Sequence, residues 1–434
     1  MTSYEAQYRD KRTTPTEIAQ RIQDGQQIWA DITLAQPPAL LEAIGARAQD
    51  RGFIGVGLNT ALDIYPMPYL RPQLLECLTS TSLFCGWETR RAVNGGYGDV
   101  LPGYYRDYPS IIREQRQVDV FCAAVSSMDK HGYFSVSTVG SFSEALLAKA
   151  QYVFLEVNRN LPRSLSAPAI HISQVTALCE NTVPLPCLPP TQLDEVSRAI
   201  GGLIAEEIPD GATIQLGIGA IPDAVGLALK NKRHLGIHTE MFTDSMVELI
   251  EDGVVDNSRK PIHRGRSVAT FAFGSQRIYD YIDDNRAIEL LPVDYVNDPA
   301  VIARHPSFVS VNAALEVDFF GQVSAESVGC RIVSGTGGQA DYVRGAIQSP
   351  GGQSFIAFPS TAKGGTVSKI VPTLTPGALI STSKNDVDNV VTEYGIARLR
   401  GRSLSQRAKA LISIAHPKFR DELVFAAKRQ NILI

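Results

Sequence analysis

The stretch that most restricts the possible folds of this chain is 212–244, where a strand, a glycine turn, a helix and a second strand follow one another. Residues 212–216 alternate apolar and polar side chains, as a strand does, and the glycines in 217–219 end that alternation. A proline and an aspartate open the segment 222–230, which is typical of the first turn of a helix. A short apolar strand is expected at 235–238, so the stretch predicts a strand–helix–strand unit of a parallel sheet.

Strands and helices alternate through the rest of the chain as well. Apolar runs that favour buried strands occur at 28–32, 53–58, 118–126, 132–137, 152–157, 267–273, 288–293, 308–317, 355–359 and 378–381. Residues 71–78 are predicted to be helical, and two further helices, 405–414 and 419–432, are expected to close the chain. This alternation predicts an α/β fold with open, mainly parallel sheets.

The length of 434 residues exceeds what one ordinary hydrophobic core accommodates, which favours two domains. Residues 158–190 contain several prolines and little regular pattern, and we interpret them as an interdomain linker. Each half has its own alternation of strands and helices. The prediction is an N-terminal α/β domain at 1–190 and a C-terminal α/β domain at 191–434, facing each other.

Composition and charge argue against several classes of protein. Hydrophobic residues make up 44% and charged residues 20%, and a net charge of −4 without a basic stripe argues against a nucleic-acid partner. The charged N-terminus does not resemble a signal peptide, and no apolar run approaches the roughly 18 residues of a membrane span, so a cytoplasmic location without membrane contact is expected. The six cysteines form no C-x-x-C pair and the histidines lack metal-ligand spacing, so we expect reduced thiols and no metal.

The glycine turn at 217–219 frees backbone N–H groups at the start of a helix, which suits an anion or a phosphate-bearing ligand. The pattern partly matches the dinucleotide fingerprint, but Pro222 stands where its third glycine is expected, which disfavours NAD binding. A purely structural turn remains the alternative. Neither a P-loop nor the G-x-S-x-G motif of serine hydrolases is present.

Two acidic residues follow expected strands. Glu240 comes just after 235–238, at a strand end of the kind where open α/β sheets bind ligands. Its neighbours His238 and Met241-Phe242 indicate a half-buried carboxylate, which needs hydrogen-bond donors and is expected to have a perturbed pKa. A solvated acid or a helix cap is the alternative. Glu393 follows another apolar strand, and a role as an interface or capping acid suits it at least as well as a catalytic one.

A second glycine loop and a lysine are further candidates. The loop 334–339 (SGTGGQ) allows backbone amides to converge on one oxygen or a ligand to approach the main chain, and a tight turn is its structural alternative. Lys363 stands beside two glycines and suits a phosphate or a carboxylate. A solvated loop lysine is the alternative there.

Long segments within 85–434 form a combined pattern that is more specific than any single motif. They are TRRAVNGG (89–96), VDVFCAAVS (118–126), DKHGYFS (129–135), EVNRNLPR (156–163), DGATIQLGIGAIPDAV (210–225), LGIHTEMFTD (235–244), VDYVNDP (293–299), VNAALEVD (311–318), SGTGGQADYVRGA (334–346), PSTAKGGTVSKIVP (359–372), VVTEYGIARLRG (390–401) and ALISIAHPKFRDEL (410–423). Together they resemble the acetyl-CoA hydrolase/transferase family, the glutamate-dependent CoA-transferases that include the 4-hydroxybutyrate, butyrate and succinate enzymes.

The chain departs from the family pattern in two places. Ser127-Met128 stands where the family commonly has Pro-Pro, and Leu34-Ala35-Gln36 replaces a more glycine-rich turn. Residues 1–84 match the family least.

The resemblance implies two similar open α/β domains with the active site in the cleft between them. It implies that Glu240 is the nucleophile of a CoA-transferase, which moves CoA from a short-chain acyl-CoA to acetate, butyrate, 4-hydroxybutyrate or succinate through a covalent glutamyl-CoA thioester with ping-pong kinetics. The amides around Gly337 and Gly338 are the implied oxyanion donors. The implied CoA-contacting residues are Gly217, Ile218, Gly219, Ala220, Ile221, Leu315, Ser334, Gly338 and Lys363.

The resemblance further implies that coenzyme A and acyl-CoA are substrates, that no cofactor is bound permanently, and that the protein is a homo-oligomer. Two other interpretations stay open. In an acyl-CoA hydrolase on the same scaffold, water intercepts an intermediate. A CoA-binding protein that has lost its chemistry is the non-enzymatic interpretation.

Overall fold

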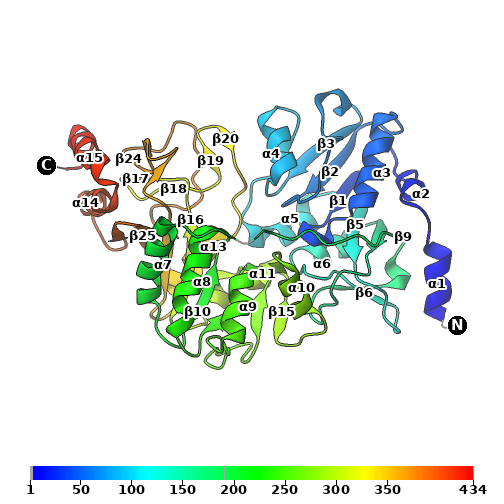
Figure 1. Ribbon diagram of the computed structural model, residues 1–434. Helices are drawn as coiled ribbons and strands as arrows, with labels where there is room; N and C mark the ends of the chain where they lie inside the picture. The colour runs from blue at the N-terminus through cyan, green and yellow to red at the C-terminus, as the bar shows by residue number, and fades with distance from the viewer. Residues whose placement is uncertain (1–2, 190, 434) are drawn as a thin grey trace. The chain divides into compact units, whose positions relative to one another are not determined.

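The computed structural model describes residues 3–189 and 191–433. Figure 1 shows the chain as ribbons of mixed helix and strand, coloured from the N-terminus to the C-terminus. The larger sheets are open and mainly parallel, with helices between successive strands. This arrangement confirms the predicted α/β fold class.

The chain divides into two compact units. The first comprises Met1–Pro189 and Ala269–Tyr295, and the second comprises Pro190–Val268 and Val296–Ile434. The first unit is therefore built from two separate stretches of sequence, and so is the second.

The segment Ala269–Tyr295 belongs to the first unit because its backbone bonds to that unit. The N–H of Gly140, for example, donates to the carbonyl of Thr270 at 2.7 Å. The predicted division into 1–190 and 191–434 differs from the observed units in this segment. A pairing between residues so far apart in the sequence leaves no local pattern from which it can be predicted.

The first unit contains a seven-stranded sheet in which every neighbouring pair is parallel. The strand order β4-β3-β2-β1-β5-β7-β9 comprises β1 (Gln27–Ala30), β2 (Val56–Thr60), β3 (Leu78–Ser82), β4 (Asp99–Val100), β5 (Val120–Val125), β7 (Tyr152–Val157) and β9 (Ala177–Glu180). Its helices are α1 (Ser3–Lys11), α2 (Pro15–Ala19), α3 (Pro38–Gln49), α4 (Trp87–Asn94), α5 (Tyr108–Gln115), α6 (Ser143–Lys149) and α10 (Gln276–Ile282). Apolar side chains of α3, such as Leu40 and Ile44, share a buried core with Ile28 of β1.

Two local expectations for the first unit are wrong. Residues 71–78 contain only the 3₁₀ turn Pro72–Leu74, and β3 begins at the end of this range. Pairing of β3 with β2 outweighs the weak helical pattern. Residues 158–190 are more than a linker, because β8 (Ala169–His171) and β9 lie within them and β9 is the edge strand beside β7.

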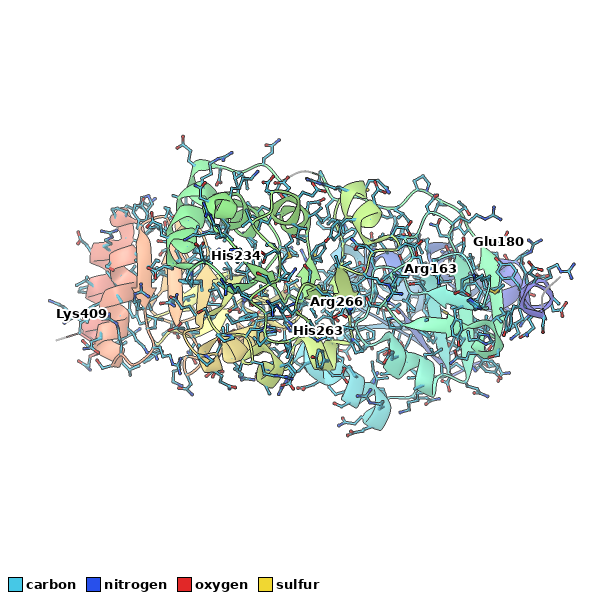
Figure 2. All side chains as sticks on the ribbon, turned by 90° about the horizontal axis from the view of Figure 1, so that it is seen from below. Arg163, Glu180, His234, His263, Arg266 and Lys409 are labelled. Atoms are coloured by element: carbon cyan, nitrogen blue, oxygen red, sulfur yellow. The ribbon has the colours of Figure 1, made fainter. Side chains whose placement is uncertain are left out.

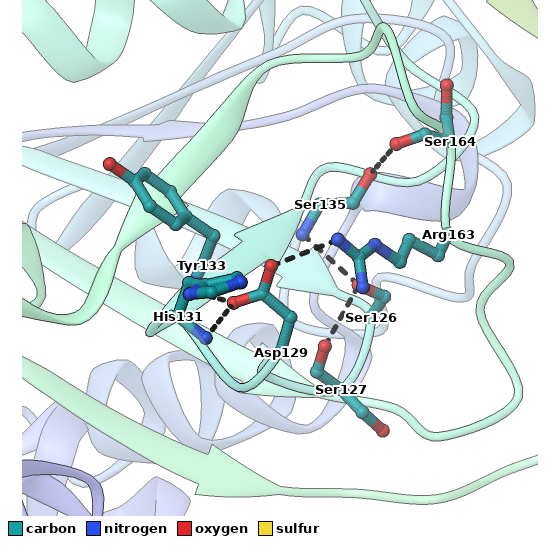
Figure 3. A network of polar contacts seen from close by, with 8 residues as sticks. All are labelled: Ser126, Ser127, Asp129, His131, Tyr133, Ser135, Arg163 and Ser164. Atoms are coloured by element: carbon teal, nitrogen blue, oxygen red, sulfur yellow. Dashed lines mark hydrogen bonds and ion pairs between the residues drawn. The ribbon is translucent and has the colours of Figure 1, made fainter. Parts of the chain in front are cut away.

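One carboxylate holds the turn that precedes β6 (Tyr133–Ser135), as Figure 3 shows. Asp129 accepts hydrogen bonds from the backbone N–H groups of His131 at 2.8 Å and Tyr133 at 2.9 Å. Arg163 forms an ion pair with the same carboxylate at 2.9 Å. β6 then pairs with β8, so Asp129 fixes the point at which the chain leaves the sheet after β5.

The second unit contains a six-stranded sheet in which β26 alone of these strands is antiparallel to its neighbour. The order β11-β10-β16-β21-β25-β26 comprises β10 (Thr213–Leu216), β11 (Gly236–Ile237), β16 (Phe308–Ala313), β21 (Gln353–Ala357), β25 (Asn389–Thr392) and β26 (Gly395–Arg398). Its longer helices are α7 (Glu195–Glu207), α8 (Ala220–Ala228), α9 (Asp244–Glu251), α13 (Gln339–Gln348), α14 (Leu404–Ile414) and α15 (Pro417–Arg429).

Short elements connect these strands and helices. They include α12 (Pro299–Ile302), β12 (Met241–Phe242), β17 (Glu316–Asp318), β18 (Val323–Ser324), β19 (Ser327–Val328), β20 (Arg331–Ile332), β22 (Thr361–Ala362), β23 (Val367–Ser368) and β24 (Ile370–Val371). The strand–turn–helix–strand prediction for 212–244 is confirmed by β10, α8 and β11, and both closing helices are confirmed by α14 and α15.

The helices α7 and α8 lie side by side (Figure 1), and one glycine allows their close approach. A β-carbon on Gly201 of α7 would stand 2.7 Å from the carbonyl carbon and 2.8 Å from the carbonyl oxygen of Ala224 in α8. The next residue, Gly202, has no atom within 4 Å of such a β-carbon. Because α8 begins directly after the glycine turn, Gly201 helps to set the position of that turn.

Substituting alanine at these adjacent glycines is expected to have opposite effects. Gly201→Ala should lower the free energy of unfolding by about 1–3 kcal/mol, because the backbone of α8 must move. Gly202→Ala should leave it unchanged or raise it by up to about 1 kcal/mol, because alanine is the better helix former. Chemical denaturation of both variants measures the difference. Equal stabilities would contradict a close contact at Gly201.

Candidate functional site

The candidate residues of the second unit follow neighbouring parallel strands. The strands β11, β10, β16 and β21 are adjacent and parallel, so their carboxyl ends meet at one edge of the sheet. Glu240 follows β11, the turn 217–221 follows β10, Leu315 follows β16, and Lys363 follows β21 by way of β22. Ligands of open α/β sheets usually bind at this edge, which is where a site was expected.

Glu240 is held by donors from two other parts of the chain. The Nδ2 of Asn297 donates to Oε2 of Glu240 at 2.8 Å, and the backbone N–H of Gly338 also donates to this carboxylate. Burial raises the pKa of Glu240 to about 7, while the bonds from Asn297 and Gly338 lower it. Near neutral pH this carboxyl group is therefore present in both its ionised and its protonated form.

The two glycines beside Glu240 meet different requirements. Gly337 has φ of +60°, a left-handed conformation that favours glycine. Gly338 has an ordinary φ of −101°, but a β-carbon there would overlap with Oε2 of Glu240 and Nδ2 of Asn297. A glycine is thus favoured at position 337 by the backbone conformation, and at position 338 because there is no room for a side chain.

Side chains and backbone groups around the glycine loop 334–339 fix its shape. The carbonyl of Glu326 accepts a bond from the N–H of Ser334 at 3.2 Å, and its carboxylate accepts one from Oγ1 of Thr336 at 3.2 Å. At the other end, Nε2 of Gln339 donates to the carbonyl of Ala313 at 2.6 Å. These bonds hold the Gly338 amide in place before any ligand binds.

Backbone hydrogen bonds on both sides fix the segment that carries Glu240. The N–H of His238 donates to the carbonyl of Ile214 at 3.2 Å, and the N–H of Thr239 donates to the carbonyl of Val268 at 2.9 Å. The side chain of His238 is buried below this segment. Glu240 is therefore fixed by its own backbone as well as by its donors.

The glycine turn after β10 has the geometry of an open helix N-terminus. The N–H of Gly217 donates to the carbonyl of Val311 at 2.9 Å, and Gly219, with φ of +106°, precedes α8. Ile218 exposes 55% of its surface, whereas Ile221 is buried. The turn thus presents an apolar side chain and the free amides of a nine-residue helix.

The other predicted ligand contacts are less tightly arranged. Lys363 is exposed and has φ of +50°, and Leu315 and Ser334 are partly buried. The structure brings Glu240 and Gly338 into direct contact. A shared ligand for 217–221, Leu315, Ser334 and Lys363 stays a prediction.

Glu393 has a structural partner. Its carboxylate accepts hydrogen bonds from the backbone N–H of Ser360 at 2.9 Å and from the Ser360 hydroxyl. These bonds tie the end of β25 to the segment after β21, which favours the structural alternative weighed for this residue.

Two polar residues could not be predicted from the sequence pattern. Asn297 belongs to the segment VDYVNDP, where an asparagine before Asp-Pro suggests only a turn or a helix cap. Lys369 is partly buried, its Nζ donates to the carbonyl of Ala314 at 2.7 Å, and burial lowers its pKa to about 8. Neither residue has a local signal, because its role depends on contacts with remote residues.

None of the described helices is long and apolar enough to cross a membrane. Within residues 3–189 and 191–433, no cluster of three or more His, Cys, Asp or Glu side chains has an arrangement that could hold a metal ion.

The raised pKa of Glu240 predicts a pH-dependent cost to stability. Because the folded-state pKa of about 7 exceeds the ordinary value of 4.5, the folded protein binds the proton more tightly, and stability falls as the pH rises through this window. Glu240→Gln removes the ionisation and can still present an oxygen to Asn297. It should therefore be more stable than the unchanged protein at pH 8 by about 1–3 kcal/mol, and nearly equal at pH 5. Denaturation at both pH values measures this, and a pH-independent difference would contradict the raised pKa.

Comparison with known proteins places the chain in a family. Residues 1–189 match the acetyl-CoA hydrolase/transferase N-terminal domain and residues 274–427 match the C-terminal domain. A succinyl-CoA:cyclohexane-1-carboxylate CoA transferase of Geobacter metallireducens is 44% identical over 99% of this chain and 98% of its own. A 4-hydroxybutyrate coenzyme A transferase of Clostridium kluyveri is 42% identical over 98% and 99%, and the crystal structure of RipA from Yersinia pestis, 39% identical, covers 100% of both chains with a TM-score of 0.94. As the resemblance predicted, this chain belongs to the acetyl-CoA hydrolase/transferase family of enzymes.

Proposed function

We propose that this protein transfers coenzyme A from a short-chain acyl-CoA to a carboxylate acceptor, with Glu240 as the nucleophile that is modified covalently. The main support is the pair of donors, Asn297 Nδ2 and the Gly338 N–H, directed at the Glu240 carboxylate. Two relatives that match nearly the whole chain carry the name CoA transferase or coenzyme A transferase. Acetate, butyrate, 4-hydroxybutyrate and succinate represent the class of acceptor.

In the first half-reaction, a carboxylate oxygen of Glu240 attacks the thioester carbonyl carbon of the acyl-CoA. A C–O bond forms, the C–S bond breaks, and the products are an acyl anhydride of Glu240 and CoA thiolate. The thiolate then attacks the glutamyl carbonyl carbon of the anhydride. The first carboxylate leaves, and a glutamyl-CoA thioester remains on the enzyme.

In the second half-reaction, the acceptor carboxylate attacks the glutamyl thioester and displaces CoA thiolate, which gives a new anhydride. The thiolate attacks the acyl carbonyl of this anhydride, the new acyl-CoA forms, and Glu240 leaves as a free carboxylate. Each step exchanges one anionic nucleophile for another, so neither water nor a redox partner is consumed. The first carboxylate departs before the second enters, which gives ping-pong kinetics.

The donors of Glu240 have a role in both halves of this cycle. Before the attack they orient the carboxylate, which replaces diffusional encounter with a fixed geometry. When thiolate or acceptor attacks the glutamyl carbonyl carbon, negative charge develops on the Glu240 oxygen that Asn297 and Gly338 already face. Preorganised donors at such an oxyanion contribute roughly 10²–10³-fold to the rate. Gly337, in its left-handed conformation, precedes the Gly338 N–H that donates to the Glu240 carboxylate.

Burial of Glu240 also affects its reactivity. A carboxylate with few surrounding water molecules loses less solvation when it attacks a thioester, and the raised pKa reflects this environment. Only the ionised form attacks, so the rate is expected to rise with pH through the range around 7. Because the bonds from Asn297 and Gly338 lower the pKa of Glu240, part of the population carries an ionised carboxylate at neutral pH.

Coenzyme A is proposed as a substrate, with no permanently bound cofactor. The exposed Ile218 and the amides of 218–221 suit the pantetheine chain, because they combine an apolar side chain with N–H groups at the start of a helix, next to Gly217. Lys363 is an exposed cation that suits a phosphate of the nucleotide. Leu315 and Ser334 complete the proposed contacts.

A hydrolase is the second candidate, because the description of the family covers both hydrolysis and transfer. In that reaction, water in place of an acceptor carboxylate attacks the glutamyl-CoA thioester or the acyl anhydride. The same residue, Glu240, forms the covalent intermediate in both cases. The two functions therefore differ in the acceptor and share the nucleophile.

Replacing Glu240 by alanine is expected to abolish CoA exchange, with a loss of roughly 10³-fold or more, because no nucleophile remains. CoA binding, measured by isothermal titration calorimetry, should survive. Incubation with acyl-CoA followed by hydroxylamine or borohydride should mark the peptide that contains Glu240, as read by mass spectrometry. A mark on another peptide, or full activity of the alanine variant, would remove Glu240 from this role.

A panel of acceptors separates the transferase from the hydrolase. Acyl-CoA donors are mixed with acetate, propionate, butyrate, 4-hydroxybutyrate, succinate or itaconate, and both new acyl-CoA and free thiol are followed. A transferase is expected to form new acyl-CoA and to release little thiol without an acceptor. Rapid thiol release that is independent of acceptor would support the hydrolase instead.

A further inference from the structure

A buried histidine connects the segment of Glu240 with the segment of its donor Asn297. The imidazole Nε2 of His238 lies 2.7 Å from the carbonyl oxygen of Val296. His238 precedes Glu240 by two residues, and Val296 directly precedes Asn297. One hydrogen bond therefore joins the two backbone segments behind the site.

The environment of His238 determines its protonation state. Its ring packs against His305, with ring centroids 5.0 Å apart, and against Phe308 at 6.3 Å. Burial lowers the pKa of His238 well below its ordinary value, and the neighbouring His305, Lys260 and His263 lower it further. The imidazole is thus neutral at physiological pH. Because a carbonyl oxygen only accepts, the single proton is on Nε2 and is donated to Val296.

The other ring nitrogen gives His238 no evident structural benefit. Its Nδ1 is buried and has no hydrogen-bond partner among residues 3–189 and 191–433. A buried unpaired nitrogen is unfavourable compared with an apolar side chain of similar size, because its lost hydrogen bond to water is not replaced. The bond from Nε2 to Val296 is the compensating interaction, which suggests that this bond has a function.

Asn297 needs such support because its own side chain is poorly anchored. The residue is buried, its Nδ2 bonds to Glu240, and its Oδ1 has no hydrogen-bond partner in the described part of the chain. The direction of the amide is therefore set mainly by the position of its backbone. After Asn297 the chain is held by Asp298, which caps α12 by accepting a bond from the N–H of Ala300. Before Asn297 the backbone belongs to the short helix α11 (Val293–Val296), and His238 bonds to the last carbonyl of that helix.

We propose that His238 is a positioning residue that aligns Asn297 with Glu240 by donating its Nε2 proton to the carbonyl of Val296. The inference rests on the proposed function for its effect on turnover, but the alignment itself does not depend on any reaction. Loss of the bond removes the side-chain anchor at the end of α11, so the backbone at 296–297 shifts and Nδ2 of Asn297 is no longer aligned with Oε2 of Glu240. The nucleophile then loses both an orienting donor and a group that stabilises its ionised form.

Two variants remove this bond and one retains it. His238→Leu has a similar volume and no donor, and the amide of His238→Asn is too short to reach Val296. In His238→Gln the amide nitrogen occupies nearly the position of Nε2 and can still donate. A matched control is His234→Asn, since His234 (Figure 2) lies four residues earlier on the same segment, is exposed, and forms its side-chain pair with Asp256.

The expected kinetic result is a fall in kcat of roughly 10- to 100-fold for the leucine and asparagine variants, with KM for acyl-CoA within about threefold. The glutamine variant should recover most of kcat, and the His234 control should match the unchanged protein. In the background of Asn297→Ala, His238→Leu should cause no further loss, because the histidine acts through the asparagine.

A titration separates failure of this inference from failure of the proposed function. The pKa of the Glu240 carboxyl, followed by carbon-13 NMR of labelled protein, should rise in His238→Leu by the same amount as in Asn297→Ala, and return in His238→Gln. This readout requires no turnover. Absence of exchange in the unchanged protein would remove the proposed function and leave the titration valid. An unshifted Glu240 pKa, or an additive effect of His238→Leu on Asn297→Ala, would overturn the positioning role.

Discussion

The contact between the Glu240 carboxylate and the backbone of Gly338 is the interaction on which the rest of the site depends. A β-carbon at Gly338 would occupy the space of the carboxylate oxygen, so the contact exists only because residue 338 is glycine. The same oxygen receives Nδ2 of Asn297 at 2.8 Å. Three segments remote in the sequence thus converge on one carboxylate, and the fold has to bring all three to the same place.

The sheet of the second unit provides this convergence. Glu240 follows β11 at the edge of the sheet where its parallel neighbours also end, and backbone bonds from His238 and Thr239 fix the direction in which it leaves. Gly338 stands at the start of α13, and its loop is tied to Glu326. Gly338 is the N-cap residue of α13, and its N–H also donates a hydrogen bond to the Glu240 carboxylate.

Much of this architecture could be predicted from local patterns, because strand and helix periodicities depend on neighbouring residues. The strand–turn–helix–strand unit at 212–244 and the closing helices are of this kind. Strand β3 was missed because its sequence LTSTS is polar at every position after Leu78 and lacks the apolar alternation of a strand, so the strand is selected by pairing with β2. The place of Ala269–Tyr295 in the first unit depends on equally non-local bonds.

The residues of the candidate site also divide into those with a local sequence pattern and those defined only by contacts with remote residues. Glu240 and the loop 334–339 could be proposed because an acid after a strand and a cluster of glycines are visible in the sequence. Asn297 could not, since an asparagine before Asp-Pro is common in turns and only its contact with Oε2 of Glu240 distinguishes it. His238 was noticed only as a neighbour of Glu240. Its bond to Val296 joins residues whose relation appears only in three dimensions.

Two opposing effects act on the pKa of Glu240, and their balance suits the proposed covalent chemistry better than it suits stability. Burial raises the pKa of the carboxyl, which makes the ionised group poorly solvated and reactive, whereas Asn297 and Gly338 lower the pKa and keep part of the population ionised. Burial alone would leave a protonated acid that cannot attack a thioester. Donors alone, in water, would leave a solvated carboxylate of low reactivity. A value of about 7 results because both effects act on the same group, and the cost in folding free energy is one that functional sites commonly carry.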